Sequence, residues 1–74
     1  MGKIPVLKPR AVIKILENLD FIEVRQRGSH KQFRHNDGRF TTVPDHQGRD
    51  ISPNLLRKIA SDIRLKVDEF LQNK

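Results

Sequence analysis

The 74-residue sequence contains no cysteine, which excludes disulfide bonds and thiolate zinc sites. Apolar packing must therefore hold the fold together, as is usual for proteins of a reducing cytoplasm. Long apolar runs are also missing: none approaches the roughly 20 residues that a membrane span needs, and residues 1–10 lack the apolar stretch of a signal peptide. We expect a soluble, cytoplasmic protein that does not insert into a membrane.

The sequence is also too short for a two-domain enzyme, since about 100 to 200 residues per domain is usual. Hydrophobic residues make up 35% of it, which is enough for one core between two layers. We therefore predict a single domain over residues 1–74.

Acidic residues are few, with nine Asp and Glu against fifteen Lys and Arg, a net charge of +6. The cations concentrate between Arg25 and Arg39, where Asp37 is the only acid. Such a positive field predicts a polyanionic partner. Charge alone does not distinguish a nucleic acid from an acidic protein or a membrane surface.

Two segments have apolar residues at the three- and four-residue spacing of a helix face. The first begins at Pro9 and the second at Ser52-Pro53, where a hydroxyl cap precedes a proline at the first helical position. Their apolar positions are Val12, Ile15, Leu16 and Leu19, and then Leu55, Leu56, Ile59, Ala60 and Ile63. A short third helix is predicted around Val67, Phe70 and Leu71.

Between these helices the sequence is rich in strand-forming residues. Residues 21–27, 30–35 and 39–43 are predicted strands, separated by Gly28-Ser29 and by a hairpin turn at Asp37-Gly38. We predict an α+β domain of order α-β-β-β-α with a short extra C-terminal helix. It is a two-layer sandwich in which the helices cover one face of a three-stranded antiparallel sheet. The opposite face is left for solvent or a ligand.

Strand alternation predicts which side chains reach that open face. If Phe33 points into the core, His30, Gln32 and Arg34 point outward. An inward Val43 would leave Phe40 outward, where it could stack on a nucleic-acid base. A second register with a bulge near Gly28 would bury Phe40 instead, so its exposure stays open at this stage.

The three histidines are candidates for chemistry. His30 and His35 are five residues apart on one strand and point to opposite faces, so they are not expected to share an ion, and we predict no metal site. The Ser29-His30 pair suggests a serine nucleophile, but adjacent strand residues diverge and no orienting acid is apparent. A serine hydrolase is therefore disfavoured.

His30 is better placed to act on RNA, since it follows several cations that attract phosphate. RNA carries its own nucleophile, the 2′-hydroxyl, so one base and stabilising cations can break the strand without a metal. His35 and His46 can each donate a proton to the leaving 5′-oxygen, and His46 is the stronger candidate. The alternative is that His30 is a polar strand residue or a simple phosphate donor.

Several segments together resemble the HicA-type toxins, the YcfA/HicA-like mRNA interferase family. They are Lys8-Pro9-Arg10, residues 21–35 with the Arg-Gly-Ser-His run at 27–30, residues 41–44, and residues 48–53 with the helix that follows. The resemblance covers nearly the whole chain. It implies a fold similar to double-stranded-RNA-binding domains, and RNA cleavage by the strand-two histidine, here His30.

The same resemblance implies the toxin of a type II toxin–antitoxin system, which arrests translation and growth by cleaving mRNA and is sequestered by a HicB-type antitoxin. No cofactor is expected. We predict catalysis by His30, with His46 as a candidate second acid. The residues predicted to bind RNA are Arg25, Arg27, Gly28, Ser29, Lys31, Arg34, Arg39 and Arg49.

Two departures from the family pattern concern the ends of the helices. Asp20 and Arg64 stand where relatives commonly carry glycine, and a non-glycine residue in a left-handed cap costs about 1 kcal/mol. Neither is expected to affect the chemistry. Two other functions stay open: a non-catalytic basic RNA-binding module, and a domain that mainly binds an antitoxin. Pairing with a second copy through an exposed sheet edge is also open.

Overall fold

The computed structural model describes residues 4–74. Three helices and three strands follow one another in the order α-β-β-β-α-α. They are α1 (Pro9–Asn18), β1 (Ile22–Arg27), β2 (His30–Arg34), β3 (Phe40–Pro44), α2 (Pro53–Asp62) and α3 (Val67–Leu71). In this part of the chain, no helix is long and apolar enough to cross a bilayer.

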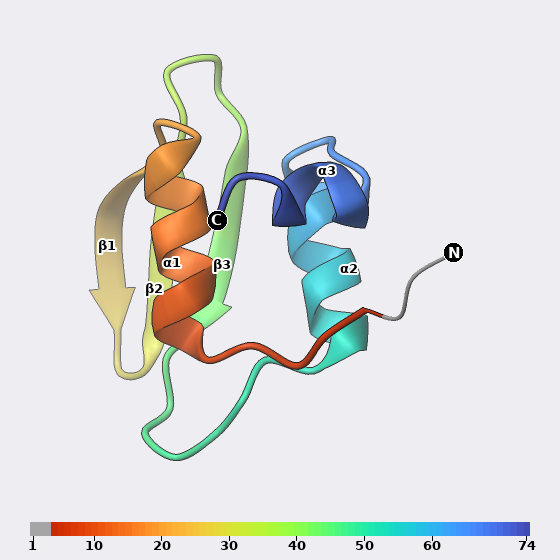
Figure 1. The fold of residues 1–74 in the computed structure, drawn as a ribbon. Helices are drawn as coiled ribbons and strands as arrows, with labels where there is room; N and C mark the ends of the chain where they lie inside the picture. The colour runs from red at the N-terminus through yellow and green to blue at the C-terminus, as the bar shows by residue number, and fades with distance from the viewer. Residues whose placement is uncertain (1–3) are drawn as a thin grey trace.

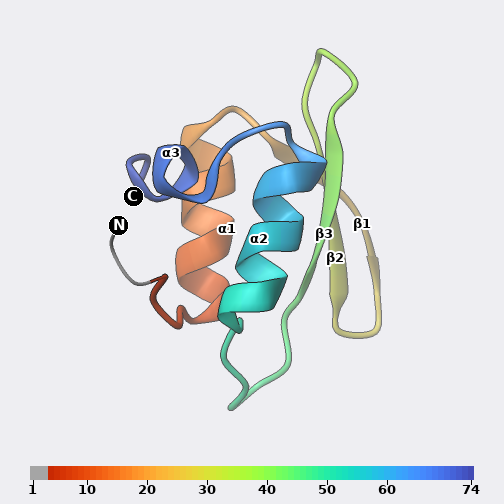
Figure 2. The same cartoon turned by 90° about the vertical axis from the view of Figure 1, so that its right-hand side faces the viewer.

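The strands form one antiparallel sheet in the order β1-β2-β3 (Figure 1). Both long helices lie on the same side of this sheet, and its other face is left uncovered (Figure 2). This confirms the predicted α+β two-layer sandwich of the double-stranded-RNA-binding type, with its short third helix. The β1–β2 turn and the β3–α2 loop lie at one end of the sheet, and the β2–β3 hairpin lies at the other (Figure 1).

The helices begin where the sequence places their start signals. Pro9 occupies the first turn of α1, where its missing amide hydrogen costs nothing. The hydroxyl of Ser52 accepts a hydrogen bond from the amide of Leu55 at 3.2 Å and caps α2. After α1 and α2, Asp20 and Arg64 adopt positive φ values of 70° and 63°, the left-handed conformation in which glycine is favoured.

The β1–β2 connection is a two-residue turn, because Arg27 pairs with His30. Gly28 takes its first central position with φ of 59°, which only glycine adopts without strain. The register shift lies between Glu23 and Arg25, so the alternative of a bulge near Gly28 is wrong. A tight turn already accounts for that glycine.

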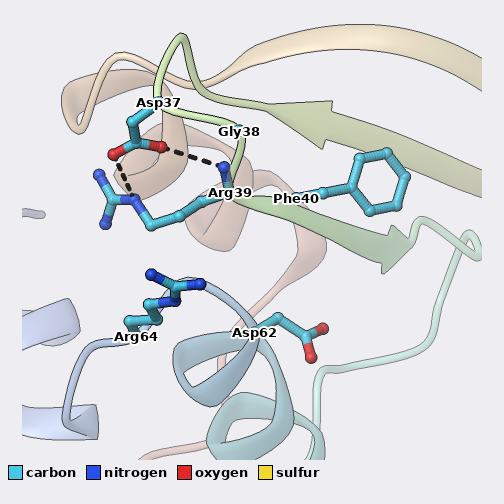
Figure 3. Close-up of a pocket in the computed structure, with 6 residues that line it drawn as sticks. All are labelled: Asp37, Gly38, Arg39, Phe40, Asp62 and Arg64. Carbon is cyan, nitrogen blue, oxygen red and sulfur yellow. Dashed lines mark hydrogen bonds and ion pairs between the residues drawn. The ribbon is translucent and has the colours of Figure 1, made fainter.

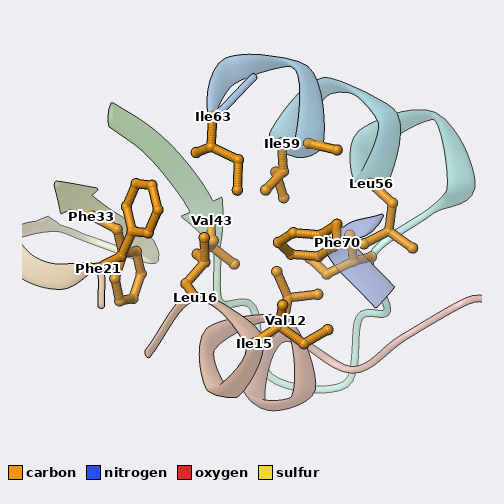
Figure 4. Packing of buried hydrophobic residues seen from close by; sticks show 12 residues of the cluster. Val12, Ile15, Leu16, Phe21, Phe33, Val43, Leu56, Ile59, Ile63 and Phe70 are labelled. Carbon is orange, nitrogen blue, oxygen red and sulfur yellow. The ribbon is translucent and has the colours of Figure 1, made fainter. Parts of the chain in front are cut away.

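The core lies between the two helices and the inner face of the sheet (Figure 4). Helical spacing brings one apolar face of α1 and one of α2 together over Phe33 and Val43, both fully buried. Phe70 of α3 is also fully buried, so the short helix closes the core from the side away from the sheet. Thr41 is a buried polar residue of this core, and its hydroxyl donates to Asp62 at 2.9 Å.

The same alternation decides the outer face. Phe33, Thr41 and Val43 point inward, so Phe40 points outward with 43% of its surface exposed. This confirms the first of the two registers considered above.

Candidate active site

His30 is the first residue of β2, next to the β1–β2 turn, and its side chain is exposed. It lies on the uncovered face because Phe33, three residues on, points into the core. Directly opposite on β1 is Arg27, which shares this face because paired residues of antiparallel strands project to the same side. An imidazole and a guanidinium are thus neighbours at the end of the sheet.

His46 comes to the same place from the β3–α2 loop. Its Nε2 lies 2.9 Å from the hydroxyl of Ser29, within hydrogen-bond distance. The ring centres of His30 and His46 are 6.2 Å apart and the ring planes are nearly perpendicular, at 83°. Two imidazoles therefore face one exposed space at the tip of the β1–β2 hairpin.

Two contacts beside His46 hold the loop against the hairpin. The amide of Asp45 donates to the carbonyl of Ser29 at 2.6 Å. On the helix-facing side of the sheet, the ammonium of Lys31 lies 2.9 Å from the Asp45 carboxylate. The hydrogen bond to Asp45 raises the pKa of Lys31 above its usual value, because the carboxylate stabilises the charged ammonium form.

Three arginines of the uncovered face surround or extend this site. Arg25 lies opposite Gln32, Arg27 opposite His30, and Arg34 near the far end of β2 opposite Ile22. All three are exposed, and none makes a side-chain hydrogen bond or ion pair with another residue in 4–74. Phe40 pairs with Arg34 across β2 and β3, and both side chains are exposed.

Lys31 and Arg39, both predicted to bind RNA, are engaged elsewhere. Lys31 is bonded to Asp45 on the helix side of the sheet. Arg39 lies at the β2–β3 end, where its Nε is 2.8 Å from Asp37 and its Nη1 donates to the carbonyl of Ile63 at 2.8 Å. The Lys31 side chain is thus on the opposite face of β2 from His30, and Arg39 is at the opposite end of the sheet.

His35 also belongs to that distant end. Its ring lies 5.1 Å from the ring of Phe21, and its Nδ1 accepts a hydrogen bond from the amide of Asp37 at 3.1 Å. The guanidinium of Arg39, from the same hairpin as His35, lies 5.2 Å from the ring centre of Phe21, the residue before β1. His35 is therefore part of the packing of the β2–β3 hairpin and is far from the His30–His46 pair.

A basic depression borders His46 on the side of the β3–α2 loop. It has a volume of about 530 Å³ and is lined by Lys8, Pro9 and Arg10 together with residues 45–49. Arg49 is one of the predicted RNA-binding residues, whereas Lys8 and Arg10 were not named. The only sequence signal for them is the Lys-Pro-Arg start of α1, which indicates a helix boundary rather than a ligand.

Over residues 4–74, no three His, Asp or Glu side chains gather in a way that could hold a metal ion. The site has the groups for proton transfer and for binding phosphate: two imidazoles, a hydroxyl and several unpaired guanidinium groups.

Comparison with known proteins gives one family. The family described as the HicA toxin of bacterial toxin–antitoxin systems matches residues 9–65, from the first residue of α1 to just beyond α2. No curated protein matches the chain. The match covers both histidines and every strand of the sheet. The chain therefore belongs to the HicA toxin family of bacterial toxin–antitoxin systems.

Proposed function

We propose that this toxin is a metal-independent endoribonuclease that cleaves mRNA at the His30–His46 pair and so arrests translation. The observation that carries the proposal is the 6.2 Å approach of the two rings on an exposed surface. A phosphodiester transfer in RNA requires one group that accepts a proton and one that donates a proton, and an imidazole can do either.

In this reaction His30 removes the proton of the 2′-hydroxyl, and the freed oxygen attacks the adjacent phosphorus. The bond from phosphorus to the 5′-oxygen breaks, and protonated His46 gives its proton to that oxygen. One proton is taken and one is given, so the products are a 2′,3′-cyclic phosphate and a 5′-hydroxyl end. No oxidant, reductant or cofactor is needed.

The arginines supply the electrostatic part of catalysis. Arg27, opposite His30, is placed to stabilise the charge that develops on the phosphate oxygens, and guanidinium groups bind such oxygens in pairs. Arg25 and Arg34 bind phosphates along the uncovered face, and Phe40 stacks on a base. Glycine at position 28 keeps side-chain atoms away from the tip of the turn, where the strand must approach.

Ser29 and Lys31 act as positioning residues. The hydroxyl of Ser29 orients the His46 ring, and Lys31 holds Asp45, the residue before His46, from the inner side of the sheet. Arg39 holds the β2–β3 hairpin against the end of α2 through its bond to the Ile63 carbonyl.

Purified wild-type protein and the His30→Ala variant test the proposal when each is incubated with RNA and excess EDTA. We expect cleavage by the wild type and a loss of about 10²- to 10⁴-fold in the variant. His30 is exposed, so the variant should melt at the wild-type temperature. Equal cleavage by the two proteins would refute the assignment.

Toxins of this class act with an antitoxin, and we propose a HicB-type antitoxin whose acidic surface covers the uncovered basic face. RNA binding without strand scission by the wild type would favour the non-catalytic module. Salt-resistant antitoxin binding with no RNA affinity would favour a pure interaction domain.

A further inference from the structure

The basic depression has His46 in its lining. One wall is the chain segment Lys8–Arg10 at the start of α1, and the other is the β3–α2 loop. The walls are tied by a short antiparallel bridge, in which the amide of Ile51 donates to the carbonyl of Leu7 at 2.7 Å and the reverse bond measures 3.3 Å. The depression is thus anchored in the fold next to the proposed acid.

The side chains of the two arginines that line the depression have no partner among residues 4–74. Asp45 is the acid among the lining residues, and it is already paired with Lys31. Lys8 is 3.0 Å from Asp50. Arg10 and Arg49 make no side-chain hydrogen bond or ion pair with any residue of 4–74, and both are exposed. Two free guanidinium groups therefore face a hollow large enough for part of a nucleotide.

The hollow at the other end of the sheet is different. It measures about 300 Å³ and is lined by residues 37–40 with Asp62 and Arg64 (Figure 3). Arg39 is held there by Asp37, and Asp62 accepts from Thr41 and Lys58. Its two acids and two arginines offset each other, so it offers little attraction to a phosphate.

We infer that the depression between Arg10 and Arg49 binds a backbone phosphate of the RNA on the 3′ side of the cleaved bond. This rests on the proposed function and adds a direction to it. The 2′-hydroxyl belongs to the nucleotide on the 5′ side of the scissile phosphate, and the leaving oxygen belongs to the nucleotide on the 3′ side. His30 is on the sheet and His46 borders the depression, so the 5′ arm lies over the sheet and the 3′ arm enters the depression.

Oligonucleotides with one cleavable position test this direction. Each is 2′-O-methyl RNA with a single unmodified ribonucleotide, placed where the wild type cuts a longer RNA. One pair of substrates carries either one or four nucleotides on the 3′ side of the scissile phosphate, and a second pair carries either one or four nucleotides on its 5′ side. With EDTA present, we expect the longer 3′ arm to raise wild-type kcat/KM about tenfold, the value of one charge-assisted phosphate contact.

The double variant Arg10→Gln/Arg49→Gln should lose most of this gain and keep the benefit of a longer 5′ arm. Arg57→Gln is the matched control, because Arg57 is an exposed arginine of α2 whose side chain contacts Asn54. It should keep both gains. Thermal melting of all three proteins checks that the fold is retained.

The outcomes separate the two proposals. Equal cleavage by wild type and His30→Ala, or no cleavage of any substrate in EDTA, overturns the proposed function. A wild type that cleaves but gains nothing from a longer 3′ arm overturns only the present inference. The inference also fails if the double variant keeps the 3′ gain, loses the 5′ gain instead, or loses only antitoxin binding.

Discussion

At the end of the sheet where β2 turns into β3, Arg39 is surrounded by partners: the Asp37 carboxylate, the carbonyl of Ile63 and the ring of Phe21. At the end where β1 turns into β2, Arg25 and Arg27 have no such partners within residues 4–74. A cation whose hydrogen bonds are satisfied within the protein stabilises the fold. A cation left unsatisfied on an exposed face is available to an anionic ligand.

The histidines follow the same division. His35 is packed against Phe21 and bonded to the Asp37 amide, while His30 and His46 are exposed and have their ring centres 6.2 Å apart. The sequence distance from His30 to His35 is short, and the distance to His46 is longer. The histidine that pairs with His30 is therefore determined by where the β3–α2 loop folds, and not by nearness along the chain.

The largest effect is expected from breaking the exposed pair. His46→Ala should slow RNA cleavage by at least about 10²-fold, because a general acid contributes on that scale. His35→Gln, the matched histidine change at the other end, should leave cleavage within about twofold and lower the melting temperature. Single-turnover cleavage and thermal melting measure the two effects. An equal loss of cleavage in both variants would contradict the division.

The arginines offer a second contrast. Arg39→Ala should reduce the free energy of unfolding by about 1–3 kcal/mol, since it leaves the carbonyl of Ile63 without its donor and removes the guanidinium contact of Asp37. Arg34→Ala removes an exposed side chain with no intramolecular bond and should change stability by less than about 0.5 kcal/mol. It should instead weaken binding of a 2′-deoxy oligonucleotide about tenfold and reduce its salt dependence. Denaturant titration measures the two stabilities, and fluorescence anisotropy measures oligonucleotide binding. A loss of stability in Arg34→Ala without a loss of binding would contradict this contrast.

A smaller effect is expected from breaking the Lys31–Asp45 ion pair, which holds the β3–α2 loop against the hairpin. Lys31→Ala should lower kcat several-fold with little change in KM, because His46 loses its support while the phosphate contacts stay. The stability loss should be at most about 1 kcal/mol, as for other partly exposed ion pairs. Equal kcat values for Lys31→Ala and the wild type would show that the Lys31–Asp45 ion pair does not position His46.

The Lys31–Asp45 pair also makes the stability of the fold depend on pH. The folded-state pKa of Lys31 is raised by its hydrogen bond to Asp45, so the contribution to stability is complete below the ordinary lysine pKa of about 10.4. It is lost as the pH rises through the higher folded value. At the opposite end, the Arg39 amide lowers the pKa of Asp37, so that contribution is present above the ordinary carboxyl pKa and is lost as the pH falls.

Much of the fold could be predicted from local patterns. The proline and serine starts of the helices, the apolar spacing on α1 and α2, and the hairpin turns are local signals, and the structure follows them. The outward direction of His30 and Phe40 follows from alternation once Phe33 and Val43 are placed in the core. The bulge between Glu23 and Arg25 has no local signal, since neither glycine nor proline marks it.

The site itself depends on contacts between distant segments. The bond from Asp45 to Ser29 and the pair of Lys31 with Asp45 bring His46 to His30, and no pattern in the sequence encodes that closure. For the same reason, the sequence could not tell which basic residues of the strand region are free to bind a ligand and which are bonded within the fold. Arg39 and Lys31 have acidic partners that are only identified once the hairpin and the loop are folded.

The most direct measurement of the two-histidine account uses an RNA whose scissile 5′-oxygen is replaced by sulfur. A thiolate leaves without protonation, so the need for a general acid disappears while the need for a base remains. We expect His46→Ala to cleave this substrate in EDTA at close to the wild-type rate and His30→Ala to stay inactive. If sulfur restores activity to His30→Ala, or to neither variant, the assignment of base and acid to these two residues is wrong.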